Sequence, residues 1–268
     1  MIEIRIMGVL NVTPDSFSDG GRFASLQAAI EQADRLIAAG ADIVDVGGES
    51  TRPYAAPVSA AEEITRVIPV IEAIRRRHRV LISIDTSKAV VARAALAAGA
   101  DMINDISALR QDPEMVAVVR QCSVPVVLMH MQGTPADMQI RPSYRDVVTE
   151  ILDFFEERVT WLSGQGIDRN RLIVDPGIGF GKSLQHNLSL LKHLDAFSRL
   201  GLPLLLGHSR KRFLGEITGQ ATAGERDLAT AVVAALCCAK GVVKIVRVHD
   251  VTGTRQALQL AAALAAAD

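Results

Sequence analysis

Short apolar runs alternate with longer amphipathic segments along nearly the whole sequence. Several of these runs are almost continuously apolar, which is typical of strands that are buried on both faces. We expect strands at Ile4–Leu10, Ile43–Val46, Val80–Ile84, Met102–Ile103, Pro125–Met129, Leu172–Val174, Pro203–Leu206 and Lys244–Val248. We expect helices at Leu26–Ala39, Ala60–Arg77, Ala89–Ala98, Pro113–Arg120, Tyr144–Leu162, Leu184–Leu194, Arg226–Lys240 and Thr254–Ala266.

Eight strand-then-helix units in about 250 residues predict an α/β fold, namely a (β/α)8 TIM barrel. We expect one domain over residues 1–268, because no linker or compositional break divides the chain. A doubly wound open sheet is the alternative, but such a sheet usually has fewer strands at this length.

A five-residue repeat supports the phase of this pattern. AAGAD occurs at Ala38–Asp42 and again at Ala97–Asp101, and AKGVV at Ala239–Val243 follows the same logic without the Asp. In each case a helical pattern ends on a glycine, the residue that best tolerates the positive φ found just after helices. A predicted strand follows at once, so we interpret the repeat as architectural.

The composition argues against several classes of protein. Lys and Arg total 29 against 30 Asp and Glu, so the net charge is −1, which does not favour a broad nucleic-acid surface but leaves room for a local anion pocket. The sequence contains no H-E-x-x-H motif and so gives no indication of a zinc site. The apolar run Ala231–Ala239 is far shorter than the roughly 20 residues of a membrane helix. Cys122, Cys237 and Cys238 form no C-x-x-C pair and no secretory signal is visible, so we expect reduced cysteines in a cytoplasmic protein.

The stretch DPGIGFGKS, from Asp175 to Ser183, partly matches a phosphate-binding P-loop. Such loops follow the pattern G-x-x-x-x-G-K-[ST], but Pro176 stands where the first glycine belongs. Two interpretations remain at this point, a nucleotide site with one substitution or a glycine-rich loop with another role. The family resemblance described below implies the second, in which Asp175 is presented to a ligand and the glycines let the backbone lie close to a flat ring. Lys182 has no clear role in this interpretation, beyond capping or lining the loop.

Polar or glycine-rich sequence follows every predicted strand, and in a barrel of this kind the active site lies at those ends. Asp, Ser, Thr and Asn often serve there only as helix caps, and this is the alternative for Thr86, Ser87, Asp105 and Thr252. Capping does not require bulky cations, however, and these indicate a bound anion. The cations are Arg52, Arg210, Lys211, Arg212, Arg247 and His249, and the carboxylates are Asp19, Asp85, Asp105 and Asp175.

Carboxylates beside an anion site either hold a metal or accept hydrogen bonds from the N–H groups of a ligand. An aminopyrimidinone edge has adjacent N–H donors that one carboxylate accepts in bidentate fashion. The mixed rim therefore predicts a ligand with a guanidine-like heterocycle at one end and phosphates at the other.

The motifs at these strand ends resemble those of the dihydropteroate synthase family of the folate pathway. In chain order they are MGVLNVTPDSFSDGG, DIVDVGGESTRP, ISIDTSK, INDISAL, MHMQGTP, DPGIGFGK, SRKRF and RVHDV, one per strand end. The resemblance covers nearly the whole chain. It implies a transferase that joins 4-aminobenzoate to 7,8-dihydropterin-6-ylmethyl diphosphate, with release of diphosphate, and that is a target of sulfonamides.

The resemblance also implies residue roles. Asn11 would coordinate Mg²⁺ together with the diphosphate, which Arg52, Arg247 and His249 would hold. The pterin pocket would comprise Asp85, Asn104, Asp175, Lys211, Met129 and Gly207. The aminobenzoate pocket would comprise Thr51, Pro53, Phe180 and Ser209. Asp19 would stabilise the developing pterin cation, and we expect catalytic roles for Asp19, Asp85, Asp175 and Lys211. The alternatives are helix capping for His249, core packing for Met129 and turn formation for Asp15 and Asp19.

Two departures from the family pattern stand out: Tyr54 replaces a common glycine after STRP, and Ile178 stands where Phe is also common. Two other functions are open to the same scaffold, a methyltetrahydrofolate-dependent methyltransferase and a non-catalytic pterin-binding protein. The resemblance further implies a homodimer, for which the apolar segments at Ala231–Ala239 and Leu258–Ala267 are candidates.

Overall fold

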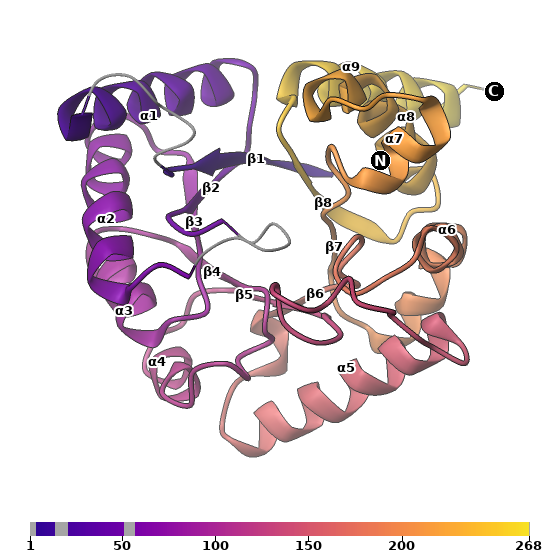
Figure 1. The fold of residues 1–268 in the computed structure, drawn as a ribbon, viewed down its shortest axis with the longest axis horizontal. Coiled ribbons are helices and arrows are strands. Elements are labelled where there is room, and N and C mark those ends of the chain that lie inside the picture. Colours follow the sequence, from indigo (N-terminus) through magenta and orange to yellow (C-terminus); the bar gives the residue numbers. More distant parts are fainter. Residues whose placement is uncertain (1–3, 14–20, 51–56, 268) are drawn as a thin grey trace.

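The apolar runs of the sequence form a closed barrel of parallel strands, ordered β1 to β8 around the ring (Figure 1). The computed structural model describes residues 4–13, 21–50 and 57–267. The strands are β1 Arg5–Asn11, β2 Ile43–Gly47, β3 Leu81–Asp85, β4 Met102–Asp105, β5 Val126–Met129, β6 Leu172–Asp175, β7 Leu204–Leu206 and β8 Val243–Val248. The predicted (β/α)8 TIM barrel is therefore confirmed, and each strand lies within about two residues of its expected position.

Helices form an outer ring around the strands (Figure 1). They are α1 Gly21–Ala38, α2 Ala60–Arg77, α3 Ala89–Ala97, α4 Met115–Arg120, α5 Val147–Gly164, α6 Leu184–Lys192, α7 Arg212–Thr218, α8 Asp227–Cys238 and α9 Val251–Ala265. The short helix α7 was not expected from the sequence, because it is an extra turn between β7 and the predicted helix α8. Within the described ranges, no helix combines the length and the apolar character needed to cross a membrane.

The repeated glycines end helices as expected. Gly40 follows α1 with a φ of 96°, and Gly99 follows α3 with a φ of 107°. Both angles lie in the region that side chains other than glycine rarely adopt. The AAGAD repeat is thus confirmed as a helix-to-strand joint.

Two apolar layers hold the barrel together. The larger one lies between the strands and the surrounding helices, and includes Phe155 and Phe197. The smaller one fills the interior of the barrel and comprises Met7, Ile43, Met102, Val127, Ile173, Leu205 and Ile245. Because side chains alternate between the two faces of a strand, this interior layer also determines which later residues point inward.

Candidate active site

The inward side chains just beyond the interior apolar layer are mostly polar. Each lies two residues after a member of that layer, which is the spacing expected for the same face of a strand. These residues are Asp45, Asn104, Met129, Asp175, Gly207 and Arg247, and on β1 the same spacing gives the apolar Val9. All of them except Val9 and Asp45 were predicted as site residues. Asp45 was missed, although counting two residues on from Ile43 would have found it.

Arg247 joins three strands at the bottom of the site. Its Nε donates to Asp45 Oδ2 on β2 and its Nη2 donates to Asp85 Oδ2 on β3, both at 2.6 Å. Asp45 Oδ2 also accepts from Asn104 Nδ2 on β4, at 3.1 Å. Asp45 is completely buried, and its Oδ1 has no hydrogen-bond partner among the described residues. One guanidinium therefore neutralises two carboxylates inside the barrel.

These interactions set the charge state of Asp85. Burial raises the pKa of its carboxyl to about 7; the Arg247 guanidinium opposes the rise and the Asp45 carboxylate adds to it. Burial also disfavours the charge on Arg247, but Asp45 and Asp85 outweigh that effect and raise its pKa. Asp85 thus titrates near neutrality while Arg247 stays charged.

Asp175 lies at the end of β6 with its carboxylate inside the site. Its Oδ1 accepts from the Gly177 N–H at 2.8 Å. The absence of a side chain at Gly207 gives its carboxylate room, since a Cβ there would lie 3.1 Å from Asp175 Oδ2. Burial raises the pKa of Asp175 to about 6, although the Gly177 N–H and the charge of Lys211 lower it. Asp175 is therefore mostly an acceptor at pH 7.

Lys211 extends into the site from the loop after β7. Its Nζ lies 3.8 Å from the centroid of the Phe180 ring, and its stem packs where a Cβ on Gly179 would stand. Burial and the charge of Arg247 lower the pKa of Lys211 to about 8, although Asp175 and Asp85 raise it. The ammonium therefore lies over an aromatic face and interacts electrostatically with these carboxyl groups.

Phe180 and Met129 belong to a small apolar cluster at the rim, together with Ile106, Met131 and Met138. Met129 is adjacent to Asp175 in the ladder between β5 and β6. An apolar wall thus stands directly beside an ionisable carboxyl, which suits a flat heterocycle with a polar edge.

Two further predicted residues lie on the other side of the opening. Ser209 Oγ is 2.9 Å from His249 Nδ1 and accepts from the His249 N–H at 3.1 Å, so these two residues lie together after β7 and β8. Asn11 ends β1 and pairs with Gly47, which in turn pairs with Asp85. A Cβ on Gly47 would lie 3.8 Å from Asn11 Oδ1 and 3.7 Å from Asp85 Oδ2, so both oxygens lie over this glycine.

Some of the expected cations do not face the site. Arg210, which has a φ of 57°, forms a two-point ion pair with Asp227 at the start of α8, at 2.6 and 2.7 Å. Arg212 has an 89% exposed side chain and pairs with Glu216 one helical turn later. Fewer of the predicted cations therefore face the site than the sequence indicated.

Other polar residues at the strand ends have local structural contacts. Asp105 accepts from Ser87 Oγ and from the N–H groups of Ser107 and Leu109, so it shapes the loop after β4. Ser183 accepts from the His186 N–H and caps α6. The serine of the P-loop-like stretch is thus a helix cap. The predicted residues Asp15, Asp19, Thr51, Arg52, Pro53 and Tyr54 lie outside the described residues.

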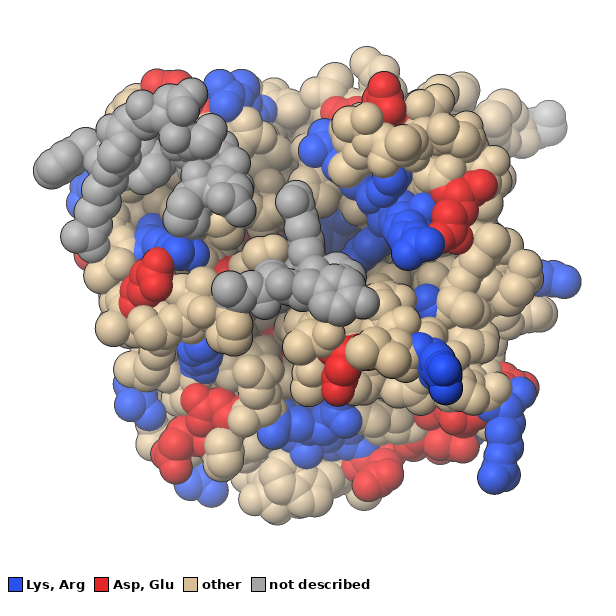
Figure 2. Space-filling model, viewed as in Figure 1, with Lys and Arg blue, Asp and Glu red and all other residues tan. Residues whose placement is uncertain are grey.

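The site opens on the face of the barrel that Figure 1 presents. The space-filling view shows Lys and Arg side chains inside a hollow near the middle of this face, over β7 and β8 (Figure 2). Charged groups in a hollow with apolar walls interact more strongly than on an open surface.

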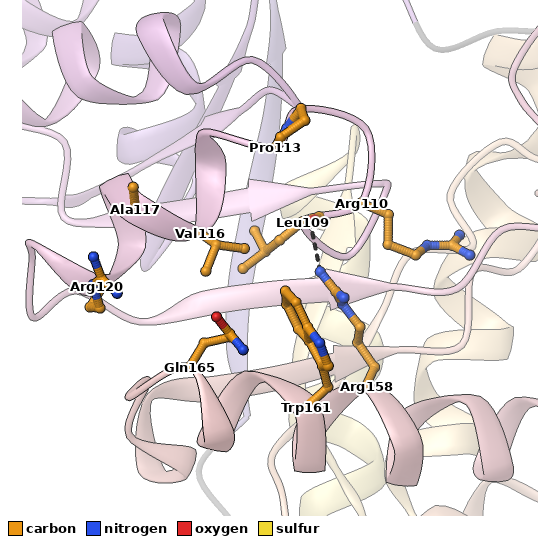
Figure 3. A pocket seen from close by; sticks show the side chains of 9 residues that line it. All are labelled: Leu109, Arg110, Pro113, Val116, Ala117, Arg120, Arg158, Trp161 and Gln165. Atoms are coloured by element: carbon orange, nitrogen blue, oxygen red, sulfur yellow. Dashed lines mark hydrogen bonds between the residues drawn. The ribbon is translucent and has the colours of Figure 1, made fainter.

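A second hollow, of about 550 Å³, lies outside the barrel between α4 and α5. Arg158 extends from α5 to the carbonyl of Leu109, and Trp161 lies beside it (Figure 3). Arg158 also donates to the carbonyl of Ala108, and both acceptor residues have a positive φ of 55–60°. We interpret Arg158 as a support for this strained loop, because such conformations persist only when neighbouring contacts hold them.

The comparisons with known proteins agree with this geometry. The family model described as "Pterin binding enzyme" matches residues 7–249. A dihydropteroate synthase from Synechocystis sp. is 48% identical over 261 residues, covering 97% of this chain and 89% of the relative.

The chain belongs to the dihydropteroate synthase family.

Solved structures of dihydropteroate synthases superpose on nearly the whole chain. The Xanthomonas albilineans enzyme with 4-aminobenzoic acid has a TM-score of 0.93 at 47% identity, covering 99% of this chain and 94% of that one. The Yersinia pestis enzyme in a sulfonamide drug complex has a TM-score of 0.93 at 44% identity, covering 99% and 95%. The part that matches the pterin-binding enzyme model includes Asn11 and His249, and hence all the site residues described above.

Proposed function

We propose that this chain condenses 7,8-dihydropterin-6-ylmethyl diphosphate with 4-aminobenzoate, giving 7,8-dihydropteroate and diphosphate for tetrahydrofolate biosynthesis. Membership of the dihydropteroate synthase family supports this transferase activity. The observation that carries it is the inner set Asp85, Asn104, Asp175, Lys211 and Arg247, which combines acceptors for an N–H edge with buried cations. A pterin diphosphate has both an N–H edge and an anionic group, so it fits both sets of residues.

In this proposal the pterin lies over the apolar interior layer with its amino edge toward Asp175 and Asn104. Asp175 accepts two N–H donors in bidentate fashion, as carboxylates do with planar amidine-like groups. Lys211 donates to an acceptor on the ring, while Met129 and Gly207 leave a flat space for it. Phe180 and Ser209, with Thr51 and Pro53, contact the aminobenzoate.

Catalysis follows from the separation of charge as the C–O bond to the diphosphate breaks. Fixed charges that match this separation stabilise the transition state more than the bound substrates. Asp85 balances positive charge on the pterin, a role that it would share with Asp19. Arg247 and His249, with Arg52, hold the diphosphate; Arg247 Nη1 makes no hydrogen bond to a described residue and is available for this contact.

The oxygen ligands present fit a magnesium ion that the protein and the substrate bind together. No cluster of three or more His, Cys, Asp or Glu side chains suited to a metal occurs within residues 4–13, 21–50 and 57–267. One amide oxygen, Asn11 Oδ1, lies at the end of β1 over Gly47. Mg²⁺ commonly takes few protein ligands and completes its shell with phosphate oxygens and water. We propose that Asn11 is the protein ligand, and that Mg²⁺ neutralises diphosphate charge.

A coupled assay tests the proposal. Purified protein is mixed with the dihydropterin diphosphate, 4-aminobenzoate and Mg²⁺, and diphosphate and dihydropteroate are measured together. We expect equimolar products that depend on aminobenzoate. A methyltransferase would give none, and a non-catalytic binding protein would retain the pterin without forming product. Either result would refute the proposal.

We also propose a homodimer formed through α8 and α9. These helices pack beside each other, and they expose apolar side chains at intervals of four residues, namely Leu228, Val232 and Leu236 on α8 and Leu260 and Leu264 on α9. Such a continuous apolar face is typical of subunit interfaces. Light scattering after gel filtration should give twice the chain mass, and Leu236→Glu should give the monomer mass; a wild-type monomer would refute the dimer.

We further propose that residues 1–268 form one domain and that the protein acts in the cytoplasm. Cys237 and Cys238 are buried and unpaired, which fits a reducing compartment. Cell fractionation with an antibody would test the location.

A further inference from the structure

Lys182 is the buried cation that the proposed function leaves unused. The residue is only 3% exposed. Its Nζ donates to the carbonyl oxygen of Phe180 at 2.9 Å, to His130 Nδ1 at 3.1 Å and to the His130 carbonyl at 3.4 Å. All three acceptors are neutral groups, and no described carboxylate forms an ion pair with it. Burial of an amine in this way is costly and lowers the pKa of Lys182 to about 7. A purely structural position would be better filled by an apolar side chain.

The three contacts of Lys182 join two loops of the rim. One follows β5 and contains His130; the other follows β6 and runs from Asp175 to Ser183. The loops already touch through the backbone, because the His130 N–H donates to the Asp175 carbonyl at 3.0 Å. At Gly177 a Cβ would overlap the His130 carbonyl, and at Gly181 it would overlap the Gln132 carbonyl. Lys182 spans the same seam from the β6 side, while Gln139 Nε2 and Tyr144 Oη on the other loop donate to the carbonyls of Gly179 and Gly181.

His130 is suited to accept from Lys182. Burial, together with the positive charges of Lys182 and Arg110, lowers its pKa to about 2, so the imidazole is neutral. Its ring packs edge-on against Phe154 with centroids 4.9 Å apart, which fixes its orientation. A neutral ring held in place offers Nδ1 as a fixed acceptor.

We propose that Lys182 is a positioning residue for 4-aminobenzoate. By holding the Phe180 carbonyl against His130, it fixes the Phe180 ring under the Lys211 ammonium, where the aminobenzoate ring is to pack. The idea rests on the proposed function. It differs from a capping role because Ser183, the next residue, already caps α6.

The decisive experiment is a double-mutant cycle between Lys182 and Phe180. Lys182→Met keeps the length of the side chain and removes its donors. We expect it to raise KM for 4-aminobenzoate about tenfold, the effect of losing roughly one charge-assisted hydrogen bond, with kcat and KM for the pterin diphosphate changed less than about threefold. Phe180→Leu should raise the same KM. The double variant should have a KM for 4-aminobenzoate no higher than that of the more affected single variant. Each change alone already removes the same fixed placement of the Phe180 ring.

A matched control is Lys240→Met. Lys240 also donates to a main-chain carbonyl, that of Lys192, but it is exposed and far along the chain from the rim loops. It should leave both KM values unchanged. If the Lys182→Met variant does not fold, the His130→Phe variant is measured instead, since this change keeps an aromatic ring at the position and removes the Nδ1 acceptor. It must then show the same selective rise in KM.

Each outcome of these measurements either supports or overturns the positioning role of Lys182. An unchanged KM for 4-aminobenzoate in folded Lys182→Met, or in His130→Phe if that is the variant that folds, would overturn the positioning role. So would additive effects in the cycle, or an equal rise in both KM values. Absence of aminobenzoate-dependent product with the wild-type protein would instead overturn the proposed function, and this inference with it.

Discussion

Replacement of Asp45 by Asn removes one of the two carboxylates that share Arg247. The change keeps the shape of the side chain and leaves Asp85 as the only ionised partner of the guanidinium. Two unit charges about 6 Å apart at an effective dielectric constant of about 20 interact by about 3 kcal/mol. An interaction of this size corresponds to about two pKa units, since one unit is about 1.4 kcal/mol. Loss of the Asp45 charge is therefore enough to lower the pKa of Asp85 from about 7 to a value below that of Asp175, which is about 6.

The direction in which the pH profile moves depends on which of the two carboxyl groups has the higher pKa. Asp85 must be ionised in the proposed mechanism, so the acid limb of kcat/KM for the pterin diphosphate reports the higher of the two pKa values. In the wild type that is Asp85, and in Asp45→Asn it becomes Asp175. We expect the acid limb to move down by about one pH unit. A profile of kcat/KM from pH 5 to pH 9 measures it.

The same change should reduce stability. Asp45 Oδ1 is buried with no partner in the part of the chain that the structure describes, so an amide NH₂ in its place would lack an acceptor there, and Arg247 also loses part of its compensation. Together these cost about 2–4 kcal/mol of unfolding free energy. Asp101→Asn is the matched control, since Asp101 accepts from the Ile82 N–H and pairs with Arg75 at the opposite end of β4. It should lower the melting temperature and leave the acid limb in place. An acid limb of Asp45→Asn that stays fixed or rises would refute the reasoning.

Three further predictions test other parts of the site. Asp175→Asn should weaken pterin binding at least tenfold in calorimetry while the melting temperature stays near that of the wild type, because the amide has one acceptor oxygen and presents an NH₂ donor where the second oxygen was; unchanged binding would remove Asp175 from the pocket. Gly177→Ala should lower the unfolding free energy by about 3 kcal/mol in chemical denaturation, because its φ is 69° and a Cβ would overlap the His130 carbonyl. Gly164→Ala, on α5 with open space around it, should instead be neutral or stabilising. Sulfonamides should raise KM for 4-aminobenzoate in steady-state kinetics without lowering kcat; a noncompetitive pattern would place them elsewhere.

Much of the fold was predictable from local patterns. The strand and helix periods, and the glycines that end α1 and α3, depend on neighbours in the sequence, so the barrel and its phase followed from them. The short helix α7 was missed because its pattern is too brief to separate from the long helix that follows. The positions of most site residues were equally predictable, since an active site in this fold lies where strands end.

The partners of those residues were not predictable. Arg210 and Arg247 both appear in the sequence as cations near the end of a strand, yet Arg210 pairs with Asp227 on α8 and Arg247 pairs with carboxylates on β2 and β3. Closure of the barrel brings β8 beside β1, so Arg247 meets residues about 160–200 positions earlier in the chain. No local pattern encodes such a distance.

The sequence by itself thus determined the barrel, the family and the rim on which the chemistry lies, because strand period and chain order decide which end of each strand carries which motif. Only the tertiary structure decided that Asp45 shares Arg247 with Asp85, that Lys182 joins two loops without an ion pair to a described carboxylate, and that Asp85 titrates near neutrality. The physical reason is that burial, hydrogen bonding and charge compensation are properties of groups brought together from distant strands. They arise when the ring of strands closes.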